Sequence, residues 1–132
     1  MKYLLVMSLY VFFSCSDWDT RLILVNKTNQ MIKEHYELMN LNDTIPDLSY
    51  CEKTNLYDIY PNSEKILRTQ NKWDLSLKGR SDKILRIYII NEDSIKKYGT
   101  CKIFKQQIFL KRFDLNYSDL EKLNWKIVYN VK

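Results

Sequence analysis

The segment Ile84-Leu-Arg-Ile-Tyr-Ile-Ile90 carries the strongest β-forming pattern in the chain. Both of its alternating faces are apolar except at Arg86. A strand that is apolar on both faces is covered on both sides, so residues 84–90 are predicted to form the central strand of a sheet.

Shorter apolar segments on both sides of this one have the length and alternation of further strands. They comprise residues 21–26, 31–39, 65–69, 73–77, 108–115 and 125–131, with one irregular strand inside 48–58. Short helices are expected at residues 94–98, 100–107 and 118–124, although the second of these segments fits a loop equally well. The last helix begins with a predicted capping box, Ser118-Asp-Leu-Glu121.

This order of elements predicts a mainly β fold, either a small antiparallel β-sandwich or an open sheet with two or three short helices. Residues 31–39 alternate weakly and fit a helix too, although a strand is favoured. Hydrophobic residues make up 45% of the chain and aromatic residues 14%, which excludes a disordered protein. Trp73 and Trp125 are expected in the core. Residues 21–132 are therefore predicted to form a single β-rich domain.

The N-terminus has the three parts of a secretory signal. Lys2 precedes an apolar run over residues 3–13, and Ser14-Cys15 follows that run. A transmembrane helix needs about 20 apolar residues, so this run is too short to span a bilayer. The segment Phe12-Phe13-Ser14-Cys15 resembles the lipobox of bacterial lipoproteins.

The lipobox resemblance implies a signal peptide at residues 1–14, a lipid-bearing N-terminus at Cys15 and a lipidated tether at residues 15–20. Acyl chains such as palmitate would then hold the protein at the outer membrane, on its periplasmic face or at the cell surface. The alternative is that Cys15 is an ordinary cysteine beside a cleavage site.

Three motifs near the C-terminus occur in a distinctive order. Phe109-Leu-Lys-Arg-Phe-Asp-Leu115 is followed by Asp119-Leu120 and then by Asn124-Trp125. This order resembles the ending of small lipoproteins of the Bacteroidetes, in which a Lys-Arg-aromatic-Asp-Leu strand precedes an Asp-Leu helix and an Asn-Trp strand. Residues 19–28 are similar to the first strand of those proteins. The resemblance implies a location in the cell envelope and a β-rich fold, and it implies no activity.

Two short motifs are similar to O-glycosylation sites of the same phylum, in which Asp precedes Ser or Thr and an aliphatic residue. They are Asp43-Thr44-Ile45 and Asp93-Ser94-Ile95, so Thr44 and Ser94 are candidate glycosylated residues. The acidic segment Ser16-Asp17-Trp18-Asp19 is similar to the signal that exports such lipoproteins to the cell surface.

Two cysteines remain once Cys15 carries lipid. In an oxidising compartment Cys51 and Cys101 are candidates for a disulfide, and the alternative is two separate buried thiols. His35 is the single histidine and the chain has no Cys-x-x-Cys motif, so the usual zinc sites lack ligands. We therefore expect neither a metal site nor a cofactor, and we expect His35 at the surface.

The sequence favours a binding role over catalysis. It contains no Gly-x-Ser-x-Gly motif and no Gly-rich phosphate loop, and its single histidine is the only imidazole base for a nucleophile. The net charge of +5 includes Lys2 of the signal and comes from dispersed lysines, so no nucleic-acid partner is expected. Polar loops at residues 40–47 and 78–82 are the expected recognition surface.

We therefore expect a lipid-anchored envelope lipoprotein that is not an enzyme and that acts as a binding or accessory module. It would meet the membrane through its N-terminal lipid, and its further partner would be an envelope protein or a glycan. A structural subunit of a larger outer-membrane or surface complex is the alternative, and an envelope hydrolase is a third.

Overall fold

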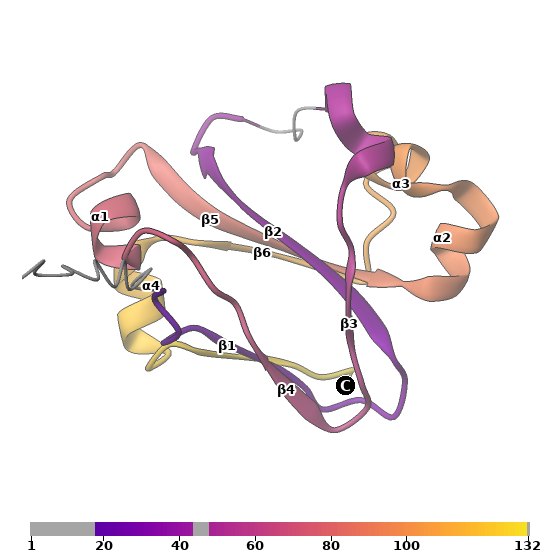
Figure 1. Ribbon diagram of the computed structural model, residues 1–132, viewed down its shortest axis with the longest axis horizontal. Helices are drawn as coiled ribbons and strands as arrows, with labels where there is room; N and C mark the ends of the chain where they lie inside the picture. The colour runs from indigo at the N-terminus through magenta and orange to yellow at the C-terminus, as the bar shows by residue number, and fades with distance from the viewer. Residues whose placement is uncertain (1–17, 44–47, 132) are drawn as a thin grey trace, which may run out of the picture.

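The structure, a computed structural model, describes residues 18–43 and 48–131, the side chains of residues 48–50 excepted. Within these residues, seven strands form two sheets, and four short α-helices and one 3-10 helix complete the fold (Figure 1). The mainly β fold predicted from the sequence is thus confirmed, as a sandwich of two sheets. Cys15 and Thr44 lie outside the described residues.

The larger sheet has four antiparallel strands and is built around residues 83–91. β5 (Lys83–Asn91) lies between β2 (Ile32–Asn40) and β6 (Lys111–Leu115), and β3 (Tyr57–Ile59) pairs with the other edge of β2. Residues 84–90 are buried throughout. The prediction of a central strand that is covered on both faces is confirmed.

The smaller sheet brings together strands from the two ends of the domain. β1 (Ile23–Asn26) pairs antiparallel with β4 (Ser63–Ile66) and parallel with β7 (Lys126–Tyr129). The sequence predicts an antiparallel sandwich or an open sheet, and the parallel pairing of β1 with β7 departs from the antiparallel arrangement. No hairpin turn sets the relative direction of these two strands, because the whole larger sheet lies between them in the chain.

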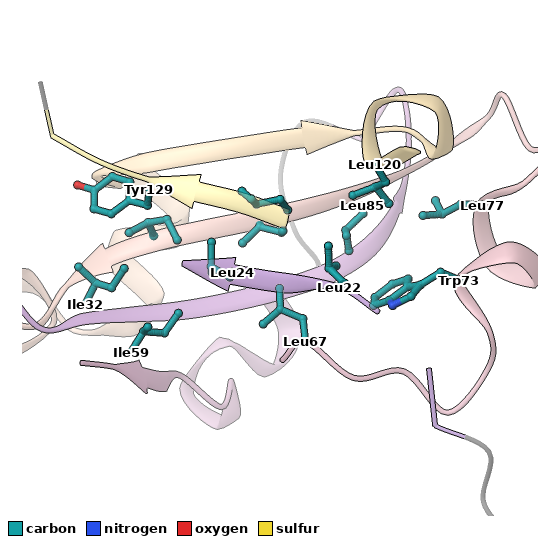
Figure 2. Close-up of a cluster of buried hydrophobic side chains, with 13 residues drawn as sticks. Leu22, Leu24, Ile32, Ile59, Leu67, Trp73, Leu77, Leu85, Leu120 and Tyr129 are labelled. Atoms are coloured by element: carbon teal, nitrogen blue, oxygen red, sulfur yellow. The ribbon is translucent and has the colours of Figure 1, made fainter. Parts of the chain in front are cut away.

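The main hydrophobic core fills the space between the two sheets (Figure 2). Strands of both sheets contribute to it, together with two short helices, α1 (Trp73–Leu77) and α4 (Tyr117–Lys122). Its buried members are Leu22, Leu24, Ile32, Ile59, Leu67, Trp73, Leu77, Leu85, Ile87, Ile89, Leu120, Ile127 and Tyr129. Because they come from segments far apart in the chain, this core forms only when those segments meet.

Residues 73–77 form helix α1 and not the predicted strand. Trp73 and Leu77 are buried, whereas Leu75 between them is 72% exposed. A strand would place all three side chains on one face, while a helix brings residues four apart to the same side. Burial of Trp73 and Leu77 therefore fits a strand and a helix equally well. The exposure of Leu75 is what distinguishes the helix from the strand.

Several boundaries also differ from the sequence prediction. Residues 48–58 hold a 3-10 helix, η1 (Leu48–Lys53), followed by β3, where the sequence predicts one irregular strand. The capping box of α4 uses Asn116 and Asp119 in place of Ser118 and Glu121, so the helix starts earlier. The strands predicted at 65–69, 108–115 and 125–131 are observed at 63–66, 111–115 and 126–129.

Three short helices cover the outer face of the larger sheet at one end (Figure 1). α2 (Glu92–Tyr98) and α3 (Thr100–Gln106) follow β5, and η1 packs against α3. We call η1, α2 and α3 the helical cap. Its apolar side chains meet the outward side of β5 in a second cluster of Tyr88, Ile90, Ile103 and Phe104.

Candidate functional site

An open groove of about 580 Å³ lies on the side of the sandwich where β3 and β4, the edge strands of the two sheets, follow each other in the chain. It is lined by three aromatic rings and by mostly charged side chains: Trp18, Tyr36, Tyr57, Glu64, Lys65, Ile66 and Arg68. We call this feature the aromatic groove. Its walls come from both sheets, so the sandwich must form before the groove exists.

Trp18 lines the groove because Asp19, the next residue, is bonded to the folded domain. The buried Asp19 carboxylate accepts hydrogen bonds from the Arg21 guanidinium and from the backbone N–H of Trp73. The Asp19 backbone also forms an isolated bridge with Thr69. The hydrogen bonds from Arg21 lower the pKa of Asp19 to about 2, so this carboxylate stays ionised far below neutral pH. The folded domain therefore begins before Arg21, within the predicted tether.

The three rings of the groove differ in exposure. Trp18 and Tyr57 are 43% and 49% exposed, so both rings are partly open to solvent. Tyr36 is half-buried, and its hydroxyl donates a hydrogen bond to the Arg68 carbonyl. This bond connects β2 to the segment that follows β4 and holds the Tyr36 ring between the two sheets.

A buried ion pair lies behind the groove wall. Glu34 projects from β2 on the same face as Tyr36, and it is 0% exposed. The Lys65 ammonium from β4 lies 2.8 Å from Glu34 Oε1 and 4.2 Å from the centre of the Tyr57 ring. Because Lys65 also lines the groove, its side chain links the buried carboxylate to the groove wall.

The Glu34 carboxylate has few partners for a buried charge. Among the described residues, no backbone N–H or hydroxyl donates a hydrogen bond to either oxygen, and Lys65 is the ion-pair partner. Burial raises the pKa of Glu34, and the Lys65 ammonium acts in the opposite direction. Buried polar groups normally have all their partners, so a sparsely bonded carboxylate beside a groove marks a candidate binding site.

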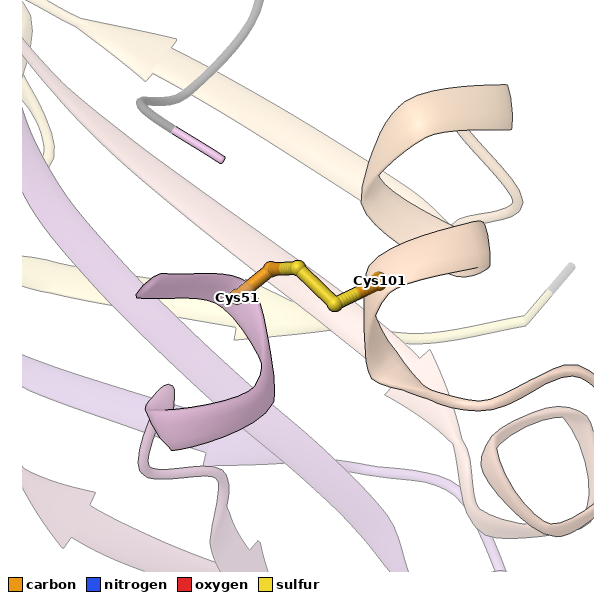
Figure 3. The surroundings of a disulfide bond; sticks show 2 residues. All are labelled: Cys51 and Cys101. Carbon is orange, nitrogen blue, oxygen red and sulfur yellow. A yellow bond between two sulfur atoms is a disulfide. The ribbon is translucent and has the colours of Figure 1, made fainter. Parts of the chain in front are cut away.

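Cys51 on η1 and Cys101 on α3 are joined by a disulfide, with 5.0 Å between their Cα atoms (Figure 3). The sequence left this pairing open against two separate buried thiols. The bond ties two elements of the helical cap to each other, and neither cysteine lines the aromatic groove.

The other predicted residues lie away from the groove. Ser94, the described one of the two candidate glycosylation residues, is half-buried in the first turn of α2. His35 is half-buried and not at the surface, because its outward position on β2 places it against the second cluster. Its ring lies 6.0 Å from the Tyr88 ring and meets the Phe104 ring edge-on.

The loops expected to form the recognition surface are joined to each other. The backbone N–H of Leu41 donates to the Asp82 carbonyl, and the Lys83 ammonium donates to the Asn40 side chain. These contacts lie at the end of the sandwich that carries α1 (Figure 1). No described residue of either loop lines the aromatic groove.

The aromatic groove is not predicted by the sequence. Tyr36, Tyr57 and Lys65 belong to three strands whose pairing across the two sheets leaves no local pattern. One signal was present, since Glu34 is a charged residue at a position of β2 that alternation assigns to the inward face. Such a residue, inside an otherwise apolar core, points to a partner or a site.

The described part of the chain holds neither a cluster of metal ligands nor a membrane-spanning helix. Among residues 18–43 and 48–131, no three His, Cys, Asp or Glu side chains are placed to hold a metal ion. No helix in that same part of the chain is long and apolar enough to cross a membrane. Comparisons with protein-family models, with curated proteins and with solved structures find no match to this chain.

Proposed function

We propose that the protein is a lipid-anchored, non-catalytic binding module of the bacterial outer membrane, and that the aromatic groove is its ligand site. The anchor is supported by the apolar run that ends at Ser14-Cys15. Trp18, which lines the groove, lies three residues after Cys15. Three residues span at most about 11 Å, so the groove would open close to the membrane surface.

A saccharide is the ligand class that fits the groove best. The observation that carries this proposal is the presence of two exposed rings, Trp18 and Tyr57, beside the charged groups of Glu64, Lys65 and Arg68. Aromatic faces contact the apolar faces of sugar rings, and charged side chains at the rim hydrogen-bond to hydroxyl groups. Envelope glycans are within reach of a lipoprotein at the outer membrane.

Tyr57 provides the direct test of this proposal, because Tyr60 is a matched control. Both tyrosines are exposed, at 49% and 64%, but only Tyr57 lines the groove. We expect Tyr57→Ala to weaken the binding of envelope saccharides by about tenfold, as the loss of a contact of roughly 1.4 kcal/mol requires. Tyr60→Ala should bind like the wild type. A titration followed by tryptophan fluorescence measures both variants, and equal affinities would contradict the proposal.

The anchor is tested by replacing Cys15. Metabolic labelling with a fatty acid should mark the wild-type protein and leave the Cys15→Ala variant unmarked. A variant with serine at both Cys51 and Cys101 is the control, and it should still be labelled. Fatty-acid label on the Cys15→Ala variant would show that the lipid is attached elsewhere.

The alternative class, a structural subunit, predicts a different result. Such a subunit would co-purify from native membranes with a protein partner in equal amounts, and the Tyr57→Ala variant would retain that partner. Saccharide binding that depends on Tyr57 separates the binding module from this alternative.

A further inference from the structure

We propose that the ligand of the aromatic groove carries an alkylammonium group, and that this group takes the place that Lys65 now holds against Glu34 and Tyr57. The proposal rests on the groove being the ligand site. It adds the chemical class of the ligand, which is a saccharide that bears a free amine.

The position of the Lys65 ammonium is already a cation site. Its two contacts are the Glu34 carboxylate, at 2.8 Å, and the face of the Tyr57 ring, at 4.2 Å from the ring centre. A carboxylate and an aromatic face are two kinds of group that bind ammonium ions in proteins. An ammonium group on a ligand would find the same two partners at the same place.

Lys65 is placed to leave that site. It lies on β4, an edge strand, and its side chain is 27% exposed, whereas Glu34 is completely buried on a strand inside the larger sheet. When Lys65 turns outward, its ammonium regains water and its four-carbon chain regains rotamer freedom. Glu34 cannot turn out into solvent, so its carboxylate needs another cation when Lys65 leaves.

Exchange of one ammonium for another keeps the charge of the buried carboxylate balanced. A ligand gains additional contacts that Lys65 does not make, because Trp18 and Tyr36 line the same groove. Glu64, the other carboxylate that lines the groove, is 58% exposed and pairs with Lys126 at 3.2 Å, so water screens its attraction for a cation far more than burial allows at Glu34. Glu34 is therefore the anion that an incoming ammonium would meet.

Charged and titratable side chains from three strands lie near Glu34. Lys65 faces it from β4, Tyr57 lies opposite it on β3, and Tyr36 and His35 are its neighbours on β2. Among these groups, the Lys65 ammonium is the one within ion-pair distance of the Glu34 carboxylate, so Lys65 is the cation that balances Glu34.

The variant Lys65→Ala empties the cation site and leaves a space that n-propylammonium matches, from Cγ to Nζ. At pH 8 we expect n-propylammonium chloride to raise the melting temperature of this variant by about 5 °C more than NaCl at equal concentration, with saturation. 1-Propanol, the neutral analogue, should have no such effect. The wild type should bind n-propylammonium at least about tenfold more weakly, because Lys65 competes for the site.

The double variant Glu34→Gln, Lys65→Ala is the control that removes both charges. It should fold, and n-propylammonium should act on it no more than NaCl does. If Lys65→Ala alone is unfolded at pH 8, the proposal predicts that n-propylammonium restores folding and that NaCl does not. Equal effects of n-propylammonium and NaCl on Lys65→Ala, or an equal effect on the double variant, would overturn the proposal.

Saccharides test the same site in the wild-type protein. At pH 6, where sugar amines are protonated, oligomers of glucosamine should bind at least about tenfold more tightly than oligomers of N-acetylglucosamine, because only the former carry ammonium groups. Glu34→Gln should remove this preference. If envelope saccharides bind in a Tyr57-dependent way but no amine is preferred, the groove remains the ligand site and the ammonium proposal fails. If binding is independent of Tyr57, both proposals fail.

Discussion

β5 separates two regions of the molecule that are held together in different ways. On its inner side lies the main core, whose buried members come from both sheets and from helices α1 and α4. On its outer side lies the helical cap, which covers four buried residues, two of them from β5 itself and two from α3. Many segments of the chain therefore contribute buried side chains to the main core, and few contribute to the cluster under the cap.

The helices of the cap are too short to be stable by themselves. They have six or seven residues each, whereas an isolated helix needs about 12 residues to become even marginally stable in water. The disulfide between Cys51 and Cys101 joins two of these helices. Burial of apolar side chains therefore holds the sandwich together, while the cap depends on a covalent bond as well as on its small cluster.

The largest effect is expected from a change in the main core. Trp73→Ala should lower the free energy of unfolding by about 4 kcal/mol, because it removes a fully buried ring and leaves a cavity at one end of the sandwich. Leu75→Ala is the matched control in the same helix, and its change should stay within about 0.5 kcal/mol since Leu75 is exposed. Urea denaturation measures both variants. A similar loss for each would mean that α1 does not close the core.

A smaller and more local effect is expected from the cap. Serine at both Cys51 and Cys101 should lower the free energy of unfolding by about 3 kcal/mol, the middle of the usual range for a disulfide. Hydrogen exchange should show lost protection in α2 and α3, while β1 and β7 keep theirs. A uniform loss of protection in both regions would contradict the separation of cap and sandwich.

The third effect concerns the groove at the margin of the core, and it depends on pH. Lys65→Met leaves Glu34 buried without its counter-ion, so the pKa of Glu34 rises further above its usual value of 4.5. A raised pKa in the folded state costs stability as pH rises above the unfolded value, because the unfolded chain ionises first.

We therefore expect Lys65→Met to be about 2 kcal/mol less stable than the wild type at pH 8 and nearly equal to it at pH 4. Urea denaturation at a series of pH values measures this difference. The double variant Glu34→Gln, Lys65→Met should show no such pH dependence. A loss of the same size at pH 4 and pH 8 would show that the ion pair is not its cause.

The sequence predicts those parts of the fold that local patterns encode. The apolar run at residues 84–90 predicts the central strand, and the weak alternation of residues 31–39 favours a strand where β2 is observed. Helix α1 was not predicted, because Trp73 and Leu77 satisfy the periods of both a strand and a helix. The parallel pairing of β1 and β7 was not predicted either, since it depends on how distant segments meet.

The candidate site is less predictable than the fold for the same reason. The sequence leaves Cys51 and Cys101 as either a disulfide or two separate thiols, because it does not give the distance between them. Tyr57 and Lys65 become neighbours through the packing of two sheet edges. Only Glu34 carries a local signal, as a charge at an inward-facing strand position.

The central claim, that the protein binds its ligand between the edges of the two sheets, is tested most directly by mapping a bound ligand with protein NMR. Saccharides released from the envelope of the producing bacterium would be titrated into the isotope-labelled mature protein. Saturable shifts should concentrate at the backbone amides of Tyr36, Tyr57 and Lys65 in the groove, and Ile103 and Phe104 in the cap should stay unchanged. Shifts centred on the cap, or no saturable shifts at the groove, would contradict the account.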